Sequence, residues 1–246
     1  MQKVLPLLLT LLIAIGSCAQ DYRLPRQRRG SGEIILKRTA YTASYNPVTM
    51  QPNWVAWRLT ADHTTGDIHR KPYFQEDPDV PEPRACYQDY KGSGWTHGHM
   101  CPAADNKWSD KAMEESNLYS NICPQHATLN SGMWNRLEMR CRQWADRWGE
   151  IYIVCGPIFY KKVHETIGQH QVPVPEAFFK VILCMKGTPK AIGYVVKNND
   201  GKKRSDDYVN SIDQVERITG LDFFYQLPDE IEQKVEAAYN LEDWKH

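Results

Sequence analysis

The chain has 246 residues, 41% of them hydrophobic and 11% aromatic, which is enough for a buried core in one large domain or two small ones. Its 30 basic residues balance its 30 acidic ones, so the formal net charge is zero. A neutral chain is not drawn to nucleic acid as a whole, and any contact with phosphate must come from a local basic groove.

The N-terminal residues 1–19 have the features of an export signal. Lys3 precedes an apolar run from Val4 to Gly16, which is too short to span a bilayer and is typical of a signal peptide. The run ends in Ile15-Gly16-Ser17-Cys18, which favours a lipoprotein signal with a lipid on Cys18, while Ser17-Cys18-Ala19 fits simple secretion equally well. We therefore expect an exported protein that is secreted, periplasmic or held at the outer membrane or cell surface, with membrane contact only through Cys18.

Cysteine usage agrees with export. Six cysteines remain after Cys18, and an even number in an exported chain predicts disulfide bonds, although the sequence does not define their pairing. Cys155 and Cys184 lie in apolar, strand-like runs and are either buried thiols or cross-strand partners. The six are Cys86, Cys101, Cys123, Cys141, Cys155 and Cys184.

The first half of the chain predicts a tether, two strands and a long loop. Residues 20–32 are rich in Arg, Gln and Gly and are typical of a flexible linker. Residues 33–46 and 54–59 predict strands that pair antiparallel across the Asn46-Pro47 turn. Residues 64–84 are polar, with several prolines, and predict a long loop, which is often a functional element in a compact domain.

The second half predicts a long helix, three strands and two short helices. Apolar residues recur at spacings of three and four through residues 128–148, which indicates an amphipathic helix. Strands are expected at 151–158, 178–185 and 191–197, short helices near 211–219 and 228–239, and an apolar plug at 221–224. The sequence therefore predicts one mixed α+β domain over residues 33–246, with a central, mostly antiparallel sheet flanked by helices.

Three polar side chains suit metal-assisted hydrolysis. His99 follows the flexible Gly98, and a neutral imidazole can accept a proton from water near neutral pH. Asn130 offers a neutral oxygen of the kind that Mg²⁺ binds, although a helix cap is the alternative. Glu138 lies eight residues further on, about 12 Å of helix rise and a quarter turn away, so it should face the same pocket without ligating the ion directly. A surface ion pair with its neighbour Arg136 is the alternative for Glu138.

Two further residues are candidates by type and position. Asn121 precedes Ile122-Cys123-Pro124 and is expected either to orient His99 or to hold the strand geometry around it, with an ordinary turn residue as the alternative. Arg70, in the long loop, can bind a phosphate through two hydrogen bonds.

Together these segments resemble the DNA/RNA non-specific endonuclease family, the sugar-non-specific nucleases with a ββα-metal core. The family's Asp-Arg-Gly-His motif is matched in frame by Thr96-His97-Gly98-His99. Its later motifs, Ser-Asn-x-x-Pro-Gln and Leu-Asn-x-Gly-x-Trp-x-x-Leu-Glu, are matched by residues 120–125 and 129–138. Shorter matches extend the resemblance over nearly the whole chain, at residues 52–56, 156–158, 174–180 and 219–224.

The resemblance implies roles for these residues. His99 resembles the general base, Asn130 the Mg²⁺ ligand and Glu138 the carboxylate that holds water on the metal. Asn121 resembles the asparagine beside the catalytic histidine, and Arg70 resembles the upstream arginine that binds phosphate. The implied activity is cleavage of DNA and RNA to 5′-phosphate ends with Mg²⁺, or with Mn²⁺ as an alternative ion, and no protein partner is implied.

The departures from the family are Thr96 and His97, which stand where the family has Asp and Arg. We expect His97 and Arg136 to contact the substrate, but a histidine supplies one directed donor that is only partly charged near neutral pH. Transition-state stabilisation should therefore be weaker than in a typical member and should recover in part at acidic pH.

Two other functions fit part of the pattern. The nitrogen and sulfur atoms of a zinc site are available in the set His97, His99, Cys101, Cys123 and His126. Zinc there would indicate a structural site or a different hydrolase. The other alternative is an inactive relative that only binds nucleic acid, having lost activity through His97.

Overall fold

Antiparallel pairing organises the structure. A computed structural model describes residue 22, residues 24–26 and residues 32–245. Its largest sheet has seven strands in the order β1-β2-β3-β6-β9-β10-β11, with every neighbouring pair antiparallel. The strands are β1 (Ile34–Lys37), β2 (Thr42–Asn46), β3 (Gln51–Thr60), β6 (Glu150–Ile158), β9 (Ala177–Cys184), β10 (Lys190–Lys197) and β11 (Val209–Asn210).

The sheet is buried on both faces. On β9, Phe178 and Ile182 belong to the core on one face, whereas Phe179 and Val181 belong to the core on the other. Successive side chains of a strand point to opposite faces, so Lys180 shares the face of Phe178 and Ile182. A run that is apolar on both faces predicts a strand covered on both sides, which is what the structure has.

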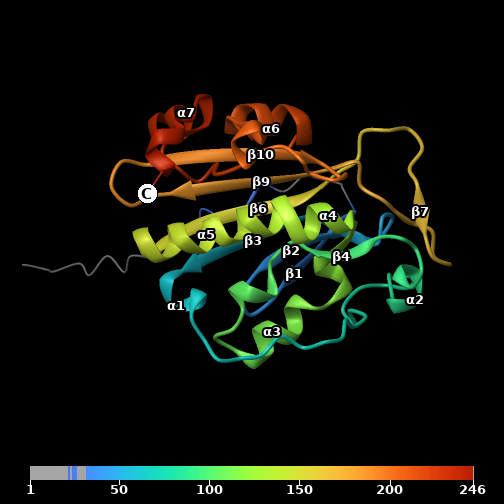
Figure 1. Cartoon of the computed structure of the whole chain (residues 1–246). Helices are drawn as coiled ribbons and strands as arrows, with labels where there is room; N and C mark the ends of the chain where they lie inside the picture. Colours follow the sequence, from blue (N-terminus) through green and yellow to red (C-terminus); the bar gives the residue numbers. More distant parts are fainter. Residues whose placement is uncertain (1–21, 23, 27–31, 246) are drawn as a thin grey trace, which may run out of the picture.

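Helices form the two covering layers. In Figure 1, α5 lies across the middle strands, while α6 and α7 lie along the top of the sheet. Phe223 and Phe224, between α6 and α7, are fully buried against the sheet, as expected for the apolar plug. The helices are α1 (Ala61–Thr64), α2 (Tyr87–Tyr90), α3 (Asp110–Ser116), α4 (Ala127–Leu129), α5 (Asn135–Trp148), α6 (Ile212–Thr219) and α7 (Asp229–Ala237).

A small hairpin beside α5 completes the fold. Strand β4 (Thr96–His99) pairs antiparallel with β5 (Ile122–Gln125), and the chain then runs through α4 and a π-helical turn, Asn130–Trp134, into α5. The two strands and this helix form a ββα unit. A second short hairpin joins β7 (Thr166–Ile167) and β8 (Val172–Pro173). Short 3₁₀ turns are η1 (Ala103–Asp105), η2 (Tyr119–Asn121), η4 (Ser205–Tyr208) and η5 (Leu241–Trp244).

The predicted α+β class, with a central antiparallel sheet and flanking helices, is confirmed. Three local predictions differ from the structure. The single strand expected at 33–46 is the hairpin β1–β2, because a turn at residues 38–41 divides it. The helix expected at 128–148 is interrupted by the π-helical turn, and the flexible segment expected at Gly98 is part of strand β4.

The expected signal at residues 1–19 lies outside the described residues. Part of the expected tether is described, and it contacts the domain. The ring of Tyr22 meets the ring of Tyr152 edge-on at 5.6 Å, and the Arg26 N–H donates to the carbonyl of Asp222 at 2.9 Å. Within the described ranges, no helix combines the length and apolar character needed to cross a bilayer.

The expected disulfides are absent among the described cysteines, because all six are free thiols. Cys101, Cys123 and Cys155 are fully buried, where a thiol packs as a small apolar group. The Cys155 thiol donates to the carbonyl of Met100 at 3.1 Å, so it holds the segment after β4 against β6 without a covalent bond.

Candidate active site

Strand β4 is held tightly against β5. Gly98 pairs with Cys123, and a Cβ built on Gly98 would lie 2.5 Å from Oε1 of Gln125. Only glycine fits such a close approach. Gly98 is therefore needed for strand packing beside His99, rather than for the flexibility that the sequence suggested.

A cavity of about 530 Å³ opens between β4, the long loop and the helix. It brings together His99, Asn130, Glu138 and Arg70, which lie far apart in the sequence. Lys107 adds a second cation that the sequence pattern did not single out. The polar side chains that line the cavity are Arg70, Thr96, His97, His99, Lys107, Asn130, Ser131, Asn135 and Glu138.

His99 is buried and oriented by Asn117. Its Nε2 lies 3.0 Å from Oδ1 of Asn117, and Nδ2 of Asn117 donates to the carbonyl of Lys71 at 3.3 Å. The second bond shows that Nδ2 of Asn117 faces the carbonyl, so its Oδ1 faces His99 and must accept a hydrogen bond from it. In the neutral ring of His99, Nε2 therefore carries the proton and Nδ1 is unprotonated. Burial lowers the pKa of His99 to about 4, against the opposing hydrogen bond to Asn117, so the ring is neutral near pH 7.

Asn130 begins the π-helical turn and is oriented through Thr96. Its Nδ2 donates to Oγ1 of Thr96 at 3.0 Å and to the carbonyl of His97 at 3.3 Å. The Thr96 hydroxyl in turn donates to the carbonyl of Gln125 at 2.8 Å, which leaves its oxygen as the acceptor for Asn130. In the described structure, Oδ1 of Asn130 has no hydrogen-bond partner and remains available as a ligand.

The π-helical turn also aligns Asn130 with Glu138. In a regular helix, two side chains eight residues apart differ by about 80° around the helix axis. The π-helical turn holds one extra residue, which changes this angle by about 100° and leaves roughly 20° between the two side chains. Both side chains accordingly line the same cavity. Burial raises the pKa of Glu138 to about 7, against the positive charges of Lys180, Arg142 and Arg70.

His97 does not act as a free cation. Its ring is stacked between Phe74 and Tyr90, with ring centres 4.2 Å and 4.3 Å away, and its Nε2 lies 3.2 Å from the hydroxyl of Tyr119. Burial and the charge of Arg70 lower the pKa of His97 to about 4. The partial charge near neutral pH that we expected from the sequence is therefore not supported, and no recovery at mildly acidic pH follows from it.

Two expected site residues lie elsewhere. Asn121 is fully buried and binds the backbone of Cys101 on both sides, accepting from its N–H and donating to its carbonyl, each at 2.9 Å. It therefore holds the strand geometry, and Asn117 takes the orienting contact with His99. Arg136 is exposed and is not among the residues that line the cavity.

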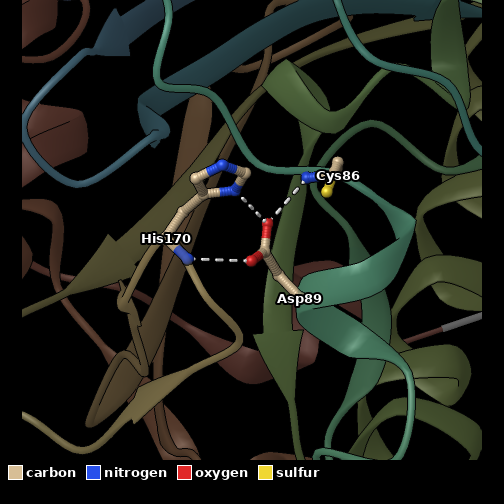
Figure 2. A group of neighbouring side chains, drawn as sticks. All are labelled: Cys86, Asp89 and His170. Atoms are coloured by element: carbon tan, nitrogen blue, oxygen red, sulfur yellow. Dashed lines mark hydrogen bonds and ion pairs between the residues drawn. The ribbon is translucent and has the colours of Figure 1, made fainter.

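A second cluster fixes α2 beside the cavity. Figure 2 shows Asp89 facing His170, and one carboxylate oxygen of Asp89 accepts a hydrogen bond from the backbone N–H of His170 at 3.1 Å. The other oxygen lies 2.9 Å from Nδ1 of His170 and 3.0 Å from the N–H of Cys86. Both oxygens of Asp89 already have partners, so the cluster has a structural role and joins the β7–β8 hairpin to α2. Tyr90, the last residue of α2, is thereby held against His97.

The zinc alternative is not supported by the geometry. Among the described residues, potential ligand atoms come within 4.8 Å of one another in two groups, Cys86–Asp89–His170 and Asp213–Glu216–Glu236. The set expected for zinc, with His97 and His99, is neither of them.

Two residues of the site were not predicted from the sequence: Asn117, which holds His99, and Lys107, which lines the cavity. Asn117 and Lys107 lie in polar stretches, where nothing in the pattern separates them from surface residues.

Known nucleases are similar to this chain in sequence and in fold. Residues 24–230 match the model of a protein family described as DNA/RNA non-specific endonuclease. The chain is 39% identical to "Nuclease EXOG, mitochondrial" of Xenopus laevis over 204 residues, which cover 76% of this chain and 57% of that protein. It is 32% identical to human "Endonuclease G, mitochondrial" over 204 residues, covering 77% and 69%. A chain of the solved EndoG/EndoGI complex superposes with a TM-score of 0.74 at 27% identity, covering 79% of this chain and 86% of that one.

These relatives bear on the predicted location of the protein and on its predicted lack of a protein partner. Both nucleases are named as mitochondrial, which contradicts the expected secreted, periplasmic or cell-surface location. That expectation depended on residues 1–19, which precede the family match. The chain spans less than two thirds of the frog protein's length. The solved complex is one in which EndoG is inhibited, whereas the sequence of this chain implied no protein partner.

Proposed function

Because the chain belongs to the DNA/RNA non-specific endonuclease family, we propose that it is a metal-dependent endonuclease that hydrolyses phosphodiester bonds of DNA and RNA to 5′-phosphate ends. The observation that carries this proposal is that one cavity is lined by His99, Asn130, Glu138 and Arg70.

The residues present fit a hard divalent cation. The amide of Asn130 is turned so that Oδ1 is unengaged, and a neutral oxygen of this kind is a suitable ligand for Mg²⁺ or Mn²⁺. Glu138 lines the same cavity and can accept hydrogen bonds from water around the ion. A bound Mg²⁺ would act as a Lewis acid that stabilises negative charge on the phosphate and the departing oxygen.

His99 is the proposed general base. Its Nδ1 is unprotonated and its Nε2 proton is held by Asn117, so the ring can take a proton from a water that attacks phosphorus. A pKa of about 4 keeps this nitrogen free across the neutral range. The low pKa also makes it a weak base, so the attacking water must be activated by its surroundings as well.

Arg70 and Lys107 supply the proposed phosphate contacts. Contacts to phosphate carry no sequence information, so cleavage should be non-specific and should weaken as salt is raised. His97 contributes no charge in this environment. The expected weaker stabilisation of the transition state, compared with a member that has Arg there, therefore stays part of the proposal.

The deciding experiment is plasmid cleavage with Mg²⁺ and with a chelator. Wild-type protein should nick and linearise the plasmid only with the metal, and His99→Ala and Asn130→Ala should lose most of this activity. His164→Ala is the matched control, because His164 lies outside the cavity. Binding of DNA without cleavage would instead support the inactive relative, and stoichiometric zinc that survives dialysis would support the zinc protein.

A further inference from the structure

Lys180 is a charged residue in the middle of the core. It lies on β9 with no exposed surface, on the same face of the sheet as Phe178 and Ile182, beneath α5. Burying an ammonium group destabilises the folded state unless its charge is compensated. An apolar side chain would pack in this position at lower cost, so the charge needs an explanation.

The immediate neighbours of the Lys180 ammonium do not compensate it fully. Its Nζ lies 4.7 Å from the ring centre of Trp134 and 5.2 Å from that of Trp57, which gives attraction to two aromatic faces. Within the described structure, Nζ has no hydrogen-bond partner. The formal charge must therefore be compensated by a carboxylate further away.

Two carboxylates act on it, the buried Asp105, which is already paired, and the partly buried Glu138. Asp105 accepts from Arg142 at 2.9 Å and from the indole of Trp57 at 3.1 Å. Glu138 follows Trp134 by four residues, so its side chain lies on the same side of the helix as the ring that contacts the ammonium group. The titratable or charged groups that act on Lys180 are Cys155 from β6, Glu138 and Cys141 from α5, and Asp105 from η1.

We propose that Lys180 is a positioning residue of the cavity, whose buried ammonium group compensates Glu138 from beneath α5 so that Glu138 presents an ionised carboxylate to the cavity at neutral pH. Arg142 is paired with Asp105 and Arg70 is exposed to solvent, so among the cations that act on Glu138 Lys180 is the buried one without a carboxylate partner of its own. The groups that act on Glu138 are Lys180, Asp105, Arg142 and Arg70.

The first test measures folding and needs no activity. Urea unfolding of the full chain is followed at about pH 5.5 and about pH 8.5 for Lys180→Met, Glu138→Gln and the double variant. At the higher pH, Lys180→Met leaves an uncompensated carboxylate and should lower the unfolding midpoint more than at the lower pH. In the Glu138→Gln background this pH dependence should vanish.

Lys180→Arg is the control for this unfolding experiment. It keeps the positive charge and should retain the wild-type pH dependence. Failure of Lys180→Met to fold at the higher pH alone would be the expected result in an extreme form. An equal loss at both pH values in both Glu138 backgrounds, or failure to fold in all of them, would show that Lys180 only fills space.

The second test rests on the proposed nuclease function. The acidic limb of kcat/KM for duplex DNA with Mg²⁺ should move upward by about one to three pH units in Lys180→Met and stay in place in Lys180→Arg. A structural role alone would lower kcat/KM equally at all pH values. If wild-type protein does not cleave at all, the proposed function fails, while the unfolding experiment still decides the role of Lys180.

Discussion

The contact between Asn117 and His99 gives the sharpest prediction about the proposed chemistry. Replacing Asn117 with Ala removes the acceptor that holds the proton on Nε2, at 3.0 Å in a fully buried position. Leaving a buried donor unpaired costs about 1–3 kcal/mol. The ring escapes part of this cost by moving its proton to Nδ1, which is the nitrogen that must accept a proton from water.

A loss of about 1–2 kcal/mol in the preference for the reactive tautomer corresponds to a fall of about 5- to 30-fold in kcat/KM. We expect that fall in steady-state cleavage of duplex DNA at about pH 8 with saturating Mg²⁺. The low pKa of His99, about 4, means that protonation of the ring does not interfere at that pH.

Ser116→Ala is the matched control for Asn117→Ala. Ser116 is the buried neighbour of Asn117, and its hydroxyl donates to the carbonyl of Met113 at 2.7 Å, away from His99. Both variants should lose stability, but only Asn117→Ala should lose turnover. If Asn117→Ala cleaves within twofold of wild type while it unfolds more easily, the proposed control of the His99 tautomer is wrong.

Three further predictions concern binding, ligand orientation and stability. Arg70→Ala should raise KM severalfold and flatten the salt dependence of cleavage, whereas Arg136→Ala, an exposed residue outside the cavity, should leave both within twofold. Thr96→Val removes one of the two acceptors that hold the Asn130 amide, so the Mg²⁺ concentration needed for half-maximal cleavage should rise, and an unchanged concentration would show that Thr96 does not orient Asn130. Burial and neighbouring carboxylates raise the pKa of Glu236 to about 9 from 4.5, so native stability is fully present below pH 4.5 and should decline as pH rises between these values. Glu236→Gln should remove that decline and stabilise the chain by on the order of 1–2 kcal/mol at about pH 8, and an unchanged pH profile of thermal unfolding would contradict the reasoning.

Local sequence patterns were sufficient to predict the main helices and strands. They were also sufficient to identify the candidate site residues whose residue type and spacing indicate a chemical role. The apolar runs of β6, β9 and β10 and the three-and-four spacing of α5 predicted a covered antiparallel sheet with a helix on it, because side-chain periodicity follows directly from backbone geometry. His99, Asn130 and Glu138 were identified as candidates from their motifs, and the structure brings all three to one cavity.

Tertiary structure decided what surrounds those residues, because burial and orientation depend on segments that are distant in the chain. Burial between Phe74 and Tyr90, together with the charge of Arg70, lowers the pKa of His97 to about 4, where the sequence suggested a partial charge near neutral pH. Asn117, rather than Asn121, reaches His99, because Asn121 is taken up by the backbone of the segment after β4. The sequence by itself determined which groups are available for chemistry, and only the packing around them determined which protons they hold and what they face.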